Sequence, residues 1–294
     1  MTHAQLGSIN EAGIRLSQEP IPSDILEKIL GRSPHPIDLE ALAAPFHGRR
    51  VLVTGGEGSL GSFLAETLER VGAIIGSPDL DTGDVTELQE MVRWQRDLAP
   101  EYVMHLAGMK HAPDGEVDPN LAFNVNVLGT QNVLATMPGA HVTVTSTCKS
   151  IQPETCYGAT KLLAERLVLN VGGSVARLYN TIETGGNVFE IWAAVPPDSP
   201  LQVMPCTRYF ITRDEAVGLI LHAATHCGRW VVNPGEAREV QSIADALFPS
   251  RDYLIVPPRR GDRKVEPRIG AHESIVELVG PFERIVGHHD ARDD

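Results

Sequence analysis

The sequence contains no long apolar run. Hydrophobic residues make up 42% of its 294 residues and charged residues 21%, yet no segment approaches the roughly 18 consecutive apolar residues that a membrane-spanning helix needs. We therefore expect no membrane insertion. The same proportions exclude a disordered or collagen-like chain. The length suits two average domains, or one large α/β domain with an appendage.

A disulfide framework and a secretion signal are also missing. The four cysteines (Cys148, Cys156, Cys206 and Cys227) have no paired spacing, and residues 1–20 lack the basic start and apolar core of a signal peptide. We interpret this as a reduced, cytoplasmic protein.

No metal centre is expected. His222, His226 and Cys227 fall on a segment whose pattern indicates a packing helix, and the His-His-Asp sequence at 288–290 lies in a charged C-terminal tail. Neither arrangement has the spacing of a ligand set.

Basic charge is scarce. The chain has 25 Lys and Arg against 38 Asp and Glu, a net charge of -13. Such an acidic chain is a poor partner for nucleic acid or an anionic membrane, because both need a basic face. An anionic ligand has to be bound locally, and residues 251–268 provide a local excess of basic over acidic residues.

The N-terminal part and the middle of the chain differ in pattern. Residues 1–47 hold two short amphipathic stretches, at 9–16 and 23–30, separated by prolines, and we interpret them as an N-terminal arm. From Arg50 onward, apolar strand-like runs alternate with helical patterns, which predicts βαβ units and a mostly parallel sheet. Strands are predicted at 51–54, 73–75, 102–106, 141–145 and 174–178, and helices at 60–71, 87–98, 120–136 and 157–170.

This alternation predicts an α/β fold, a Rossmann-type doubly wound parallel sheet over residues 48–180. Beyond it, prolines interrupt the rhythm. We expect residues 181–294 to form a small C-terminal substrate-binding lobe, interleaved with the last sheet elements, with about 207–233 returning to the sheet domain.

A glycine-rich turn follows the first strand. Gly56, Gly58 and Gly61 fit the spacing G-x-G-x-x-G, and Gly55 gives a second fit, G-x-x-G-x-x-G. Glycines between a strand and a helix let the backbone approach a pyrophosphate at the helix N-terminus. The turn therefore predicts a dinucleotide site.

The acidic residue that would bind the adenosine ribose is less evident. Asp79 or Asp81 could serve if their loop folds back, which leaves NAD or NADP open, with a slight preference for NAD. Asp84 is placed either to accept a hydrogen bond from the adenine amino group or to lie at a helix N-terminus.

Tyr157 and Lys161 lie at positions i and i+4 of a predicted helix, on one face. A neighbouring ammonium favours the phenolate and lowers the tyrosine pKa from about 10. The pair can therefore take a proton from a sugar hydroxyl as hydride leaves its carbon.

Several segments taken together resemble the bacterial polysaccharide-biosynthesis nucleotide-sugar dehydratases, the UDP-N-acetylglucosamine 4,6-dehydratase group of the extended short-chain dehydrogenase/reductases. The resemblance covers about residues 28–268. The matching segments are 30–32, 37–39, the glycine-rich turn, 105–111, 126–130, 146–149, the Tyr157/Lys161 pair, 207–210 and 260–264.

The resemblance implies a reaction in four parts. Tyr157 and Lys161 assist oxidation at C4, a base removes the C5 hydrogen, an acid assists loss of the C6 hydroxyl as water, and hydride returns to C6. The family's acid and base lie in a Thr-Asp-Lys segment, which here is Thr147-Cys148-Lys149. Lys149 would be the base. Cys148, whose unperturbed pKa of about 8.5 keeps it protonated at neutral pH, is either the acid or a small buried apolar side chain.

The resemblance also implies binding residues, an NAD or NADP cofactor, a UDP-sugar substrate and a homo-oligomer. The cofactor set is Gly55, Glu57, Gly58, Ser59, Leu60, Gly61, Asp84, Val85, Leu106, Ala107, Gly108, Lys110, Asn126, Thr145, Tyr157, Lys161, Asn180 and Thr181. The substrate set is Lys110, His111, Thr147, Asn180, Asn187, Val188, Phe189, Arg208 and Arg260.

Three functions stay open. The first is a UDP-N-acetylhexosamine 4,6-dehydratase. The second is a 4-epimerase, or an enzyme with a 5,6-unsaturated product, because the cysteine replaces the usual aspartate. The third is a non-catalytic NAD(P)-binding regulator, against which the retention of Tyr157, Lys161 and Lys149 argues.

Overall fold

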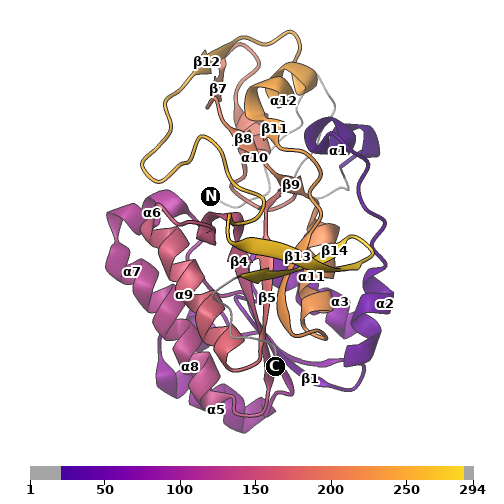
Figure 1. Ribbon diagram of the computed structural model, residues 1–294, viewed down its shortest axis with the longest axis vertical. Coiled ribbons are helices and arrows are strands. Elements are labelled where there is room, and N and C mark those ends of the chain that lie inside the picture. The colour runs from indigo at the N-terminus through magenta and orange to yellow at the C-terminus, as the bar shows by residue number, and fades with distance from the viewer. Residues whose placement is uncertain (1–20, 288–294) are drawn as a thin grey trace. The chain divides into compact units, whose positions relative to one another are not determined.

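The computed structural model describes residues 21–287 and divides into two compact units (Figure 1). Among the described residues, the sheet unit consists of 37–178, 216–233 and 267–287, and the small unit consists of 21–36, 179–215 and 234–266. The predicted amphipathic stretch at 9–16 lies outside the described residues.

The sheet unit contains an eight-stranded sheet in the order β13-β14-β10-β5-β4-β3-β1-β2. Strands β2 to β10 in this order pair in parallel, and the C-terminal hairpin β13–β14 adds to β10 antiparallel. The strands are β1 (Arg50–Thr54), β2 (Ile74–Gly76), β3 (Tyr102–His105), β4 (His141–Thr147), β5 (Ser174–Leu178), β10 (Gly228–Val232), β13 (Glu273–Val279) and β14 (Phe282–Gly287).

Helices cover both faces of this sheet, which confirms the doubly wound α/β fold. Helices α5, α8 and α9 lie over one face, and α2, α3 and α11 lie over the other (Figure 1). The helices are α2 (Leu39–Ala43), η1 (Ala44–Phe46), α3 (Ser59–Arg70), α4 (Leu80–Gly83), α5 (Leu88–Leu98), α6 (Ala112–Val117), α7 (Pro119–Phe123), η2 (Asn124–Leu128), α8 (Gly129–Thr136), η3 (Cys148–Ser150), α9 (Cys156–Asn170) and α11 (Arg213–Ala223).

The unit boundaries differ from the expected ones at both ends of the chain. Residues 37–47 belong to the sheet unit because they pack on it: the ring of Phe46 is fully buried and meets that of Tyr102 edge-on, with centroids 5.0 Å apart. Residues beyond 267 return to the sheet as the β13–β14 hairpin instead of staying with the lobe. The predicted return of about 207–233 begins at Ala216.

The sheet ends at β2, so its parallel strands lie in the order β2-β1-β3-β4-β5-β10. This follows the common doubly wound order in which the strand sequence reverses between the first and third strands, and ligands bind beside the carboxyl ends at that reversal. Only α4 and α5 lie between β2 and β3 in the chain, so no further strand is added at the β2 edge.

The helix predicted at 120–136 is interrupted by a π-helical turn, η2. The amide of Gly129 donates to the carbonyl of Asn124, five residues earlier. Such a widened turn rotates the side chains that follow it and is frequent at functional sites. It lies around Asn126, whose side chain is buried.

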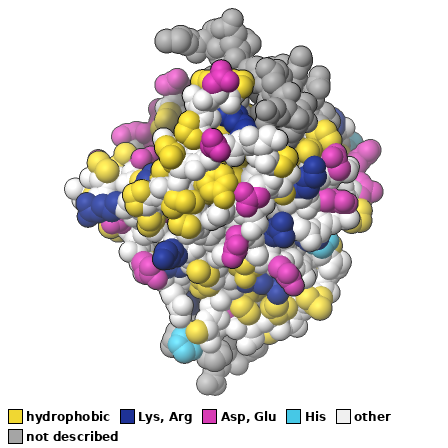
Figure 2. All heavy atoms as spheres, turned by 90° about the horizontal axis from the view of Figure 1, so that it is seen from above, with side chains coloured by type: hydrophobic (Ala, Val, Ile, Leu, Met, Phe, Trp, Pro, Cys, Tyr) yellow, Lys and Arg dark blue, Asp and Glu magenta, His cyan; other side chains and the backbone are white. Residues whose placement is uncertain are grey.

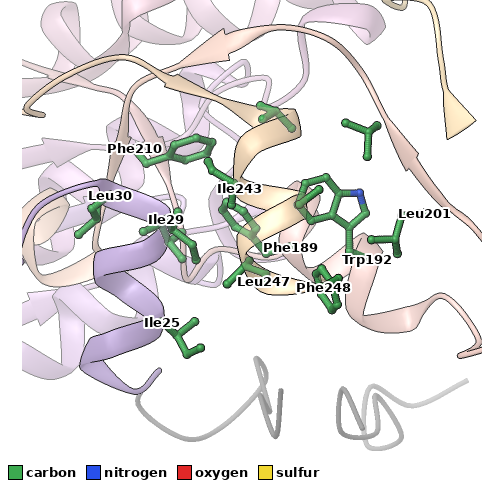
Figure 3. Close-up of a cluster of buried hydrophobic side chains, with 14 of the residues drawn as sticks. Ile25, Ile29, Leu30, Phe189, Trp192, Leu201, Phe210, Ile243, Leu247 and Phe248 are labelled. Carbon is green, nitrogen blue, oxygen red and sulfur yellow. The ribbon is translucent and has the colours of Figure 1, made fainter. Parts of the chain in front are cut away.

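The small unit has its own apolar core, drawn in Figure 3. Residues from α1, α10 and α12 meet around the aromatic rings of Phe189 and Trp192. The Trp192 indole N–H donates to the carbonyl of Gln202 at 2.9 Å, so its one polar atom is satisfied inside the core. The elements are α1 (Ser23–Leu30), β6 (Asn180–Thr181), α10 (Val188–Ala194), β7 (Leu201–Val203), β8 (Thr207–Arg208), β9 (Phe210–Ile211), β11 (Arg238–Glu239), α12 (Val240–Leu247) and β12 (Tyr253–Ile255).

The surface drawn in Figure 2 carries basic and acidic side chains interspersed with apolar ones, rather than a continuous basic area. Within residues 21–287, no helix has the length and apolar character required to span a bilayer.

Candidate functional site

The glycine-rich turn connects β1 to α3 and depends on glycine at two positions. Gly55 has φ of +72°, a left-handed conformation that suits glycine. A Cβ on Gly61 would lie 2.1 Å from the carbonyl oxygen of Gly55, so any side chain would open the turn. The backbone can therefore approach a pyrophosphate closely at the N-terminus of α3, and the turn fits a dinucleotide.

The loop after β2 folds back onto this turn, as the assignment of an acidic ribose ligand requires. The Gly55 amide donates to the carbonyl of Pro78 at 2.9 Å, and the Glu57 amide donates to Oδ2 of Asp79 at the same distance. The other Asp79 oxygen accepts from the Leu80 amide and begins α4. Asp79, rather than the exposed Asp81, thus holds a carboxylate against the glycine-rich turn.

Asp84 and Val85 lie farther along the same loop. One Asp84 oxygen accepts from both the amide and the hydroxyl of Thr86. Val85 is buried in the core of the sheet unit, and its carbonyl accepts from the side chain of Asn132. Both residues therefore have structural contacts, in addition to any contact with an adenine ring.

A buried histidine joins the carboxyl ends of β1 and β3. His105 Nδ1 lies 2.7 Å from the Thr54 hydroxyl and Nε2 lies 3.1 Å from the Thr130 hydroxyl. Burial lowers the pKa of His105 to about 3, with a smaller contribution from the Lys161 charge, so the ring is neutral. The Ala107 amide also donates to the Thr54 hydroxyl. This network fixes the chain just before the predicted cofactor residues Leu106, Ala107 and Gly108.

Asn126 links the segment after β3 to α9. Its Oδ1 accepts from the Met109 amide at 2.9 Å, and its Nδ2 donates to the Thr160 hydroxyl at 2.9 Å. The predicted cofactor residue is thus a bridge between two parts of the site. Lys110 and His111 follow in the chain and are both exposed.

Tyr157 and Lys161 lie on the inner face of α9, with 7% and 6% of their surfaces exposed. The Lys161 ammonium donates to the carbonyl of Thr145 at 3.3 Å, and a Cβ on Gly108 would lie 2.6 Å from its nitrogen. Burial lowers the pKa of Lys161 to about 8, against the opposing charge of Glu165. At neutral pH the lysine is therefore still mainly protonated, as the expected role of an ammonium beside Tyr157 would require.

The predicted acid–base segment forms a tight turn at the end of β4, which we call the 147–150 turn. The Thr147 hydroxyl accepts from the Lys149 amide and begins η3. The Cys148 side chain has no exposed surface, whereas Lys149 is half-buried. The structure thus brings the 147–150 turn, Tyr157 and Lys161 together in the sheet unit with the glycine-rich turn.

The other predicted substrate residues belong to the small unit. The Arg208 guanidinium is buried and ion-paired with Glu266, Nε to Oε1 3.2 Å. The Asn180 side chain donates to the other Glu266 oxygen at 2.8 Å. Arg260 is exposed in the chain after β12.

Three further predicted residues surround the start of α10. The side chain of Asn187 accepts from the Glu190 amide and begins this helix. Phe189 is 2% exposed and contributes to the core of the unit rather than to its surface, and the half-buried Val188 packs beside that core. Thr181 pairs with Ile211 in the short sheet β6–β9.

Among residues 21–287 there is no group of three or more histidine, cysteine or acidic side chains that could hold a metal ion. Residues 288–290 lie outside this range. His222 and His226 stack on each other, with ring centroids 4.0 Å apart, and His222 also packs edge-on against Trp230.

Comparison with known families now identifies the chain. A model of the family described as "Polysaccharide biosynthesis protein" matches residues 79–275, about two thirds of the sequence. The chain belongs to this family.

Relatives in the polysaccharide biosynthesis family agree with that assignment. The chain is 28% identical to the probable polysaccharide biosynthesis protein EpsC of Bacillus subtilis, over 87% of this chain but 50% of that protein, so it spans half of EpsC. It is 27% identical to an inverting UDP-N-acetylglucosamine 4,6-dehydratase of Campylobacter jejuni, over 81% of this chain and 82% of that one. It is also 27% identical to a UDP-glucose 4-epimerase of Rickettsia bellii, over 82% of this chain and 83% of that one.

Solved structures share the fold. A dTDP-4-dehydrorhamnose reductase from Bacillus anthracis in complex with NADP superposes with a TM-score of 0.67 at 20% identity, covering 74% of this chain and 89% of that one. A UDP-glucose 4-epimerase from Thermus thermophilus in complex with NAD gives 0.64 at 22% identity, with the same coverage.

In this member of the polysaccharide biosynthesis family, two residues beside the candidate site are absent from the sets predicted from the sequence. His105 lies in a matching segment but has no predicted role, and Glu165 lies four residues after Lys161 on the same helix face. The sequence signal for Glu165 is its position one helical turn after Lys161, on a helix with apolar neighbours.

Proposed function

We propose that the protein is a nucleotide-sugar dehydratase of the UDP-N-acetylhexosamine 4,6-dehydratase type, with a bound NAD or NADP. One observation carries this proposal: the buried Tyr157/Lys161 pair lies in the same unit as the 147–150 turn and a glycine-rich turn that fits a dinucleotide. The name of the Campylobacter jejuni relative supports the substrate class.

The chain's own groups have distinct roles in this reaction. When bound, the nicotinamide supplies the acceptor and later the donor of a hydride. Tyr157 takes the C4 hydroxyl proton, and the Lys161 ammonium favours its phenolate form. Lys149 accepts the C5 proton, which the neighbouring C4 ketone acidifies. Cys148 donates a proton to the departing C6 hydroxyl, which leaves as water. A hydride from the bound nicotinamide would then add at C6 while Lys149 returns its proton to C5, and the proton taken by Tyr157 replaces the one that Cys148 lost.

The cofactor is proposed to be NAD rather than NADP. Asp79 lies 22 residues after Glu57 and is hydrogen-bonded to its amide, near the separation at which Rossmann folds carry the carboxylate that binds a ribose hydroxyl. A 2′-phosphate would meet this negative charge, and like charges in contact disfavour binding.

The Asp79→Asn variant tests the cofactor proposal. We expect the ratio of the NADP to NAD dissociation constants to fall about tenfold or more, because the repulsion is lost while an acceptor oxygen remains. Asp81→Asn is the matched control, since it removes the same charge from an exposed position on α4. Titration of both cofactors by calorimetry gives the constants, and equal ratios in the two variants would refute the role of Asp79.

The reaction is tested by incubating the purified protein and its cofactor with UDP-N-acetylglucosamine and following product mass. Loss of one water supports dehydration. A product of unchanged mass but altered retention supports epimerisation. Absence of turnover on a panel of UDP- and dTDP-sugars would contradict both and favour a regulator.

The 4-epimerase is the second candidate because of Cys148. This thiol stands in the position of the family's aspartate and has no exposed surface, so it could be a packing residue. An epimerase needs only the Tyr157/Lys161 pair and the cofactor. The Rickettsia bellii relative carries that name.

The remaining expectations stay proposals. We propose a UDP-sugar as the small-molecule partner, a homo-oligomeric state and a cytoplasmic location. Light scattering coupled to gel filtration measures the oligomeric state directly.

A further inference from the structure

Glu165 is a fully buried carboxylate in the middle of α9 that no step of the proposed reaction uses. It lies one helical turn after Lys161, on the same helix face. Buried acidic side chains are rare unless they are paired and hydrogen-bonded. Glu165 satisfies this condition with partners from three strands and from η3.

Two arginines neutralise the carboxylate and fix its plane. Arg177 donates from Nε to Oε1 at 3.0 Å and from Nη2 to Oε2 at 2.7 Å, and Arg229 Nε donates to Oε2 at 2.8 Å. The remaining nitrogen of Arg177, Nη1, donates to Oε2 of Glu273 at 2.8 Å. The charges of Glu165 and Glu273 thus balance those of Arg177 and Arg229. The two arginine charges hold the pKa of Glu165 far below its usual range, although burial alone would raise it.

Two serine hydroxyls extend this cluster to the 147–150 turn. Ser146 donates to Glu165 Oε1 at 2.6 Å, and Ser150 lies 2.7 Å from the same oxygen. Ser150 is also 2.8 Å from the Thr147 carbonyl. The serines lie on either side of Thr147, Cys148 and Lys149, so one carboxylate oxygen holds both ends of the segment.

We propose that Glu165 is a positioning residue that holds the 147–150 turn at a fixed distance from Tyr157 and Lys161. The proposal rests on the proposed function for its catalytic consequence. The first chemical step uses α9, and the elimination uses the turn. The side chains of α9 and of the 147–150 turn must act on the same sugar ring without rearrangement. A buried carboxylate that belongs to α9 and is bonded to the turn holds the two elements rigidly together.

Charge neutralisation alone does not explain the two hydroxyls. The arginines already supply three hydrogen bonds to the carboxylate, and a buried ion pair is by itself weak evidence of a stabilising role. The serines add bonds from α9 to the 147–150 turn, which carries the predicted acid and base of the elimination. The contacts therefore serve the geometry of the turn as well as the stability of the core.

Ser150→Ala tests the proposal because it removes the hydroxyl that lies between Glu165 and the Thr147 carbonyl, and it leaves all four charged groups in place. Ser174→Ala is the matched control: Ser174 is also a buried serine of the sheet unit, and its hydroxyl donates to the His226 carbonyl at the opposite end of β5. A Glu165→Gln variant is less useful, since it leaves two buried arginines short of a counter-charge.

The kinetic readout is kcat and KM for water loss, measured with both variants at equal saturation with cofactor. We expect Ser150→Ala to lower kcat by roughly 10- to 100-fold with KM changed less than about twofold, since small misplacement of catalytic groups costs about this much. Ser174→Ala should keep both constants close to those of the parent. Equal kcat in the two variants would overturn the proposal.

Amide hydrogen exchange gives a second readout that needs no turnover. The Ile151 amide donates to the Cys148 carbonyl at 3.2 Å and reports on the turn. We expect faster exchange at 148–151 in Ser150→Ala than in Ser174→Ala. If the parent has no activity on nucleotide sugars but this difference is found, the proposed function fails and the positioning contact stands. Unchanged exchange in Ser150→Ala would overturn the contact, whatever the activity.

Discussion

Replacing Lys161 by methionine should stabilise the protein at neutral pH while removing its activity. Burial lowers the pKa of Lys161 from its usual 10.5 to about 8. At 1.36 kcal/mol per tenfold change in proton affinity, keeping the ammonium in the folded state costs about 3 kcal/mol. Methionine has a similar unbranched stem and no charge. It loses the hydrogen bond to the Thr145 carbonyl, worth about 1 kcal/mol, so the expected net gain is about 2 kcal/mol.

The gain has a defined pH dependence. Below pH 8 Lys161 is charged in both the folded and unfolded states, and the whole cost of burial is present. Between pH 8 and 10.5 the folded state has lost the proton that the unfolded state still binds, so the stability of the parent protein rises with pH. The methionine variant lacks this group, and its advantage should shrink across the same window.

Urea unfolding at pH 7 and at pH 10, followed by tryptophan fluorescence, measures both effects. Lys110→Met is the control, because Lys110 is exposed and belongs to the same unit; it should change the free energy of unfolding by less than about 0.5 kcal/mol at either pH. The reasoning would be refuted if Lys161→Met were less stable than the parent at pH 7. It would also be refuted if the variant changed the free energy of unfolding by the same amount at both pH values.

Two more predictions concern packing. Gly61→Ala should reduce NAD affinity at least tenfold by calorimetry, because its Cβ would lie 2.1 Å from the Gly55 carbonyl oxygen and force the turn open; unchanged affinity would contradict the assigned turn. Trp192→Ala should destabilise the small unit by about 3–5 kcal/mol in urea unfolding, since the side chain is fully buried in its core. A loss below about 1 kcal/mol would show that this core does not depend on the indole.

The alternation of strands and helices was predictable because it depends on local pattern. The strand at 174–178 has the predicted bounds, and the amphipathic stretch at 23–30 forms α1 over the same residues. The order of the strands followed less directly. The segment between β2 and α5 is short and holds only α4, so no further strand follows β2 at this edge of the sheet. The length of the segment is visible in the sequence, but the place of β2 at the edge depends on tertiary packing.

The supporting residues of the site were not predictable to the same degree. The π-helical turn includes a bond from the Gly129 amide to the Asn124 carbonyl, and the periodic pattern of 120–136 gives no sign of it. Glu165 has an ordinary place in the sequence, on a helix that also carries exposed charges. It becomes informative only when β4, β5 and β10 bring Ser146, Arg177 and Arg229 to the same point.

Charge counted along the chain is a poor guide to charge available for a diphosphate. The basic stretch 251–268 suggested such a site, yet Arg251 donates to backbone carbonyls at Pro196 and Ser199. Arg259 and Arg268 are ion-paired with Asp262 and Glu283, and outside the stretch Arg208 pairs with Glu266. A guanidinium already held by a buried carboxylate gains little from a phosphate, because one anion would replace another. The buried Arg208, held by Glu266, is therefore a weaker diphosphate candidate than its place in the sequence suggests.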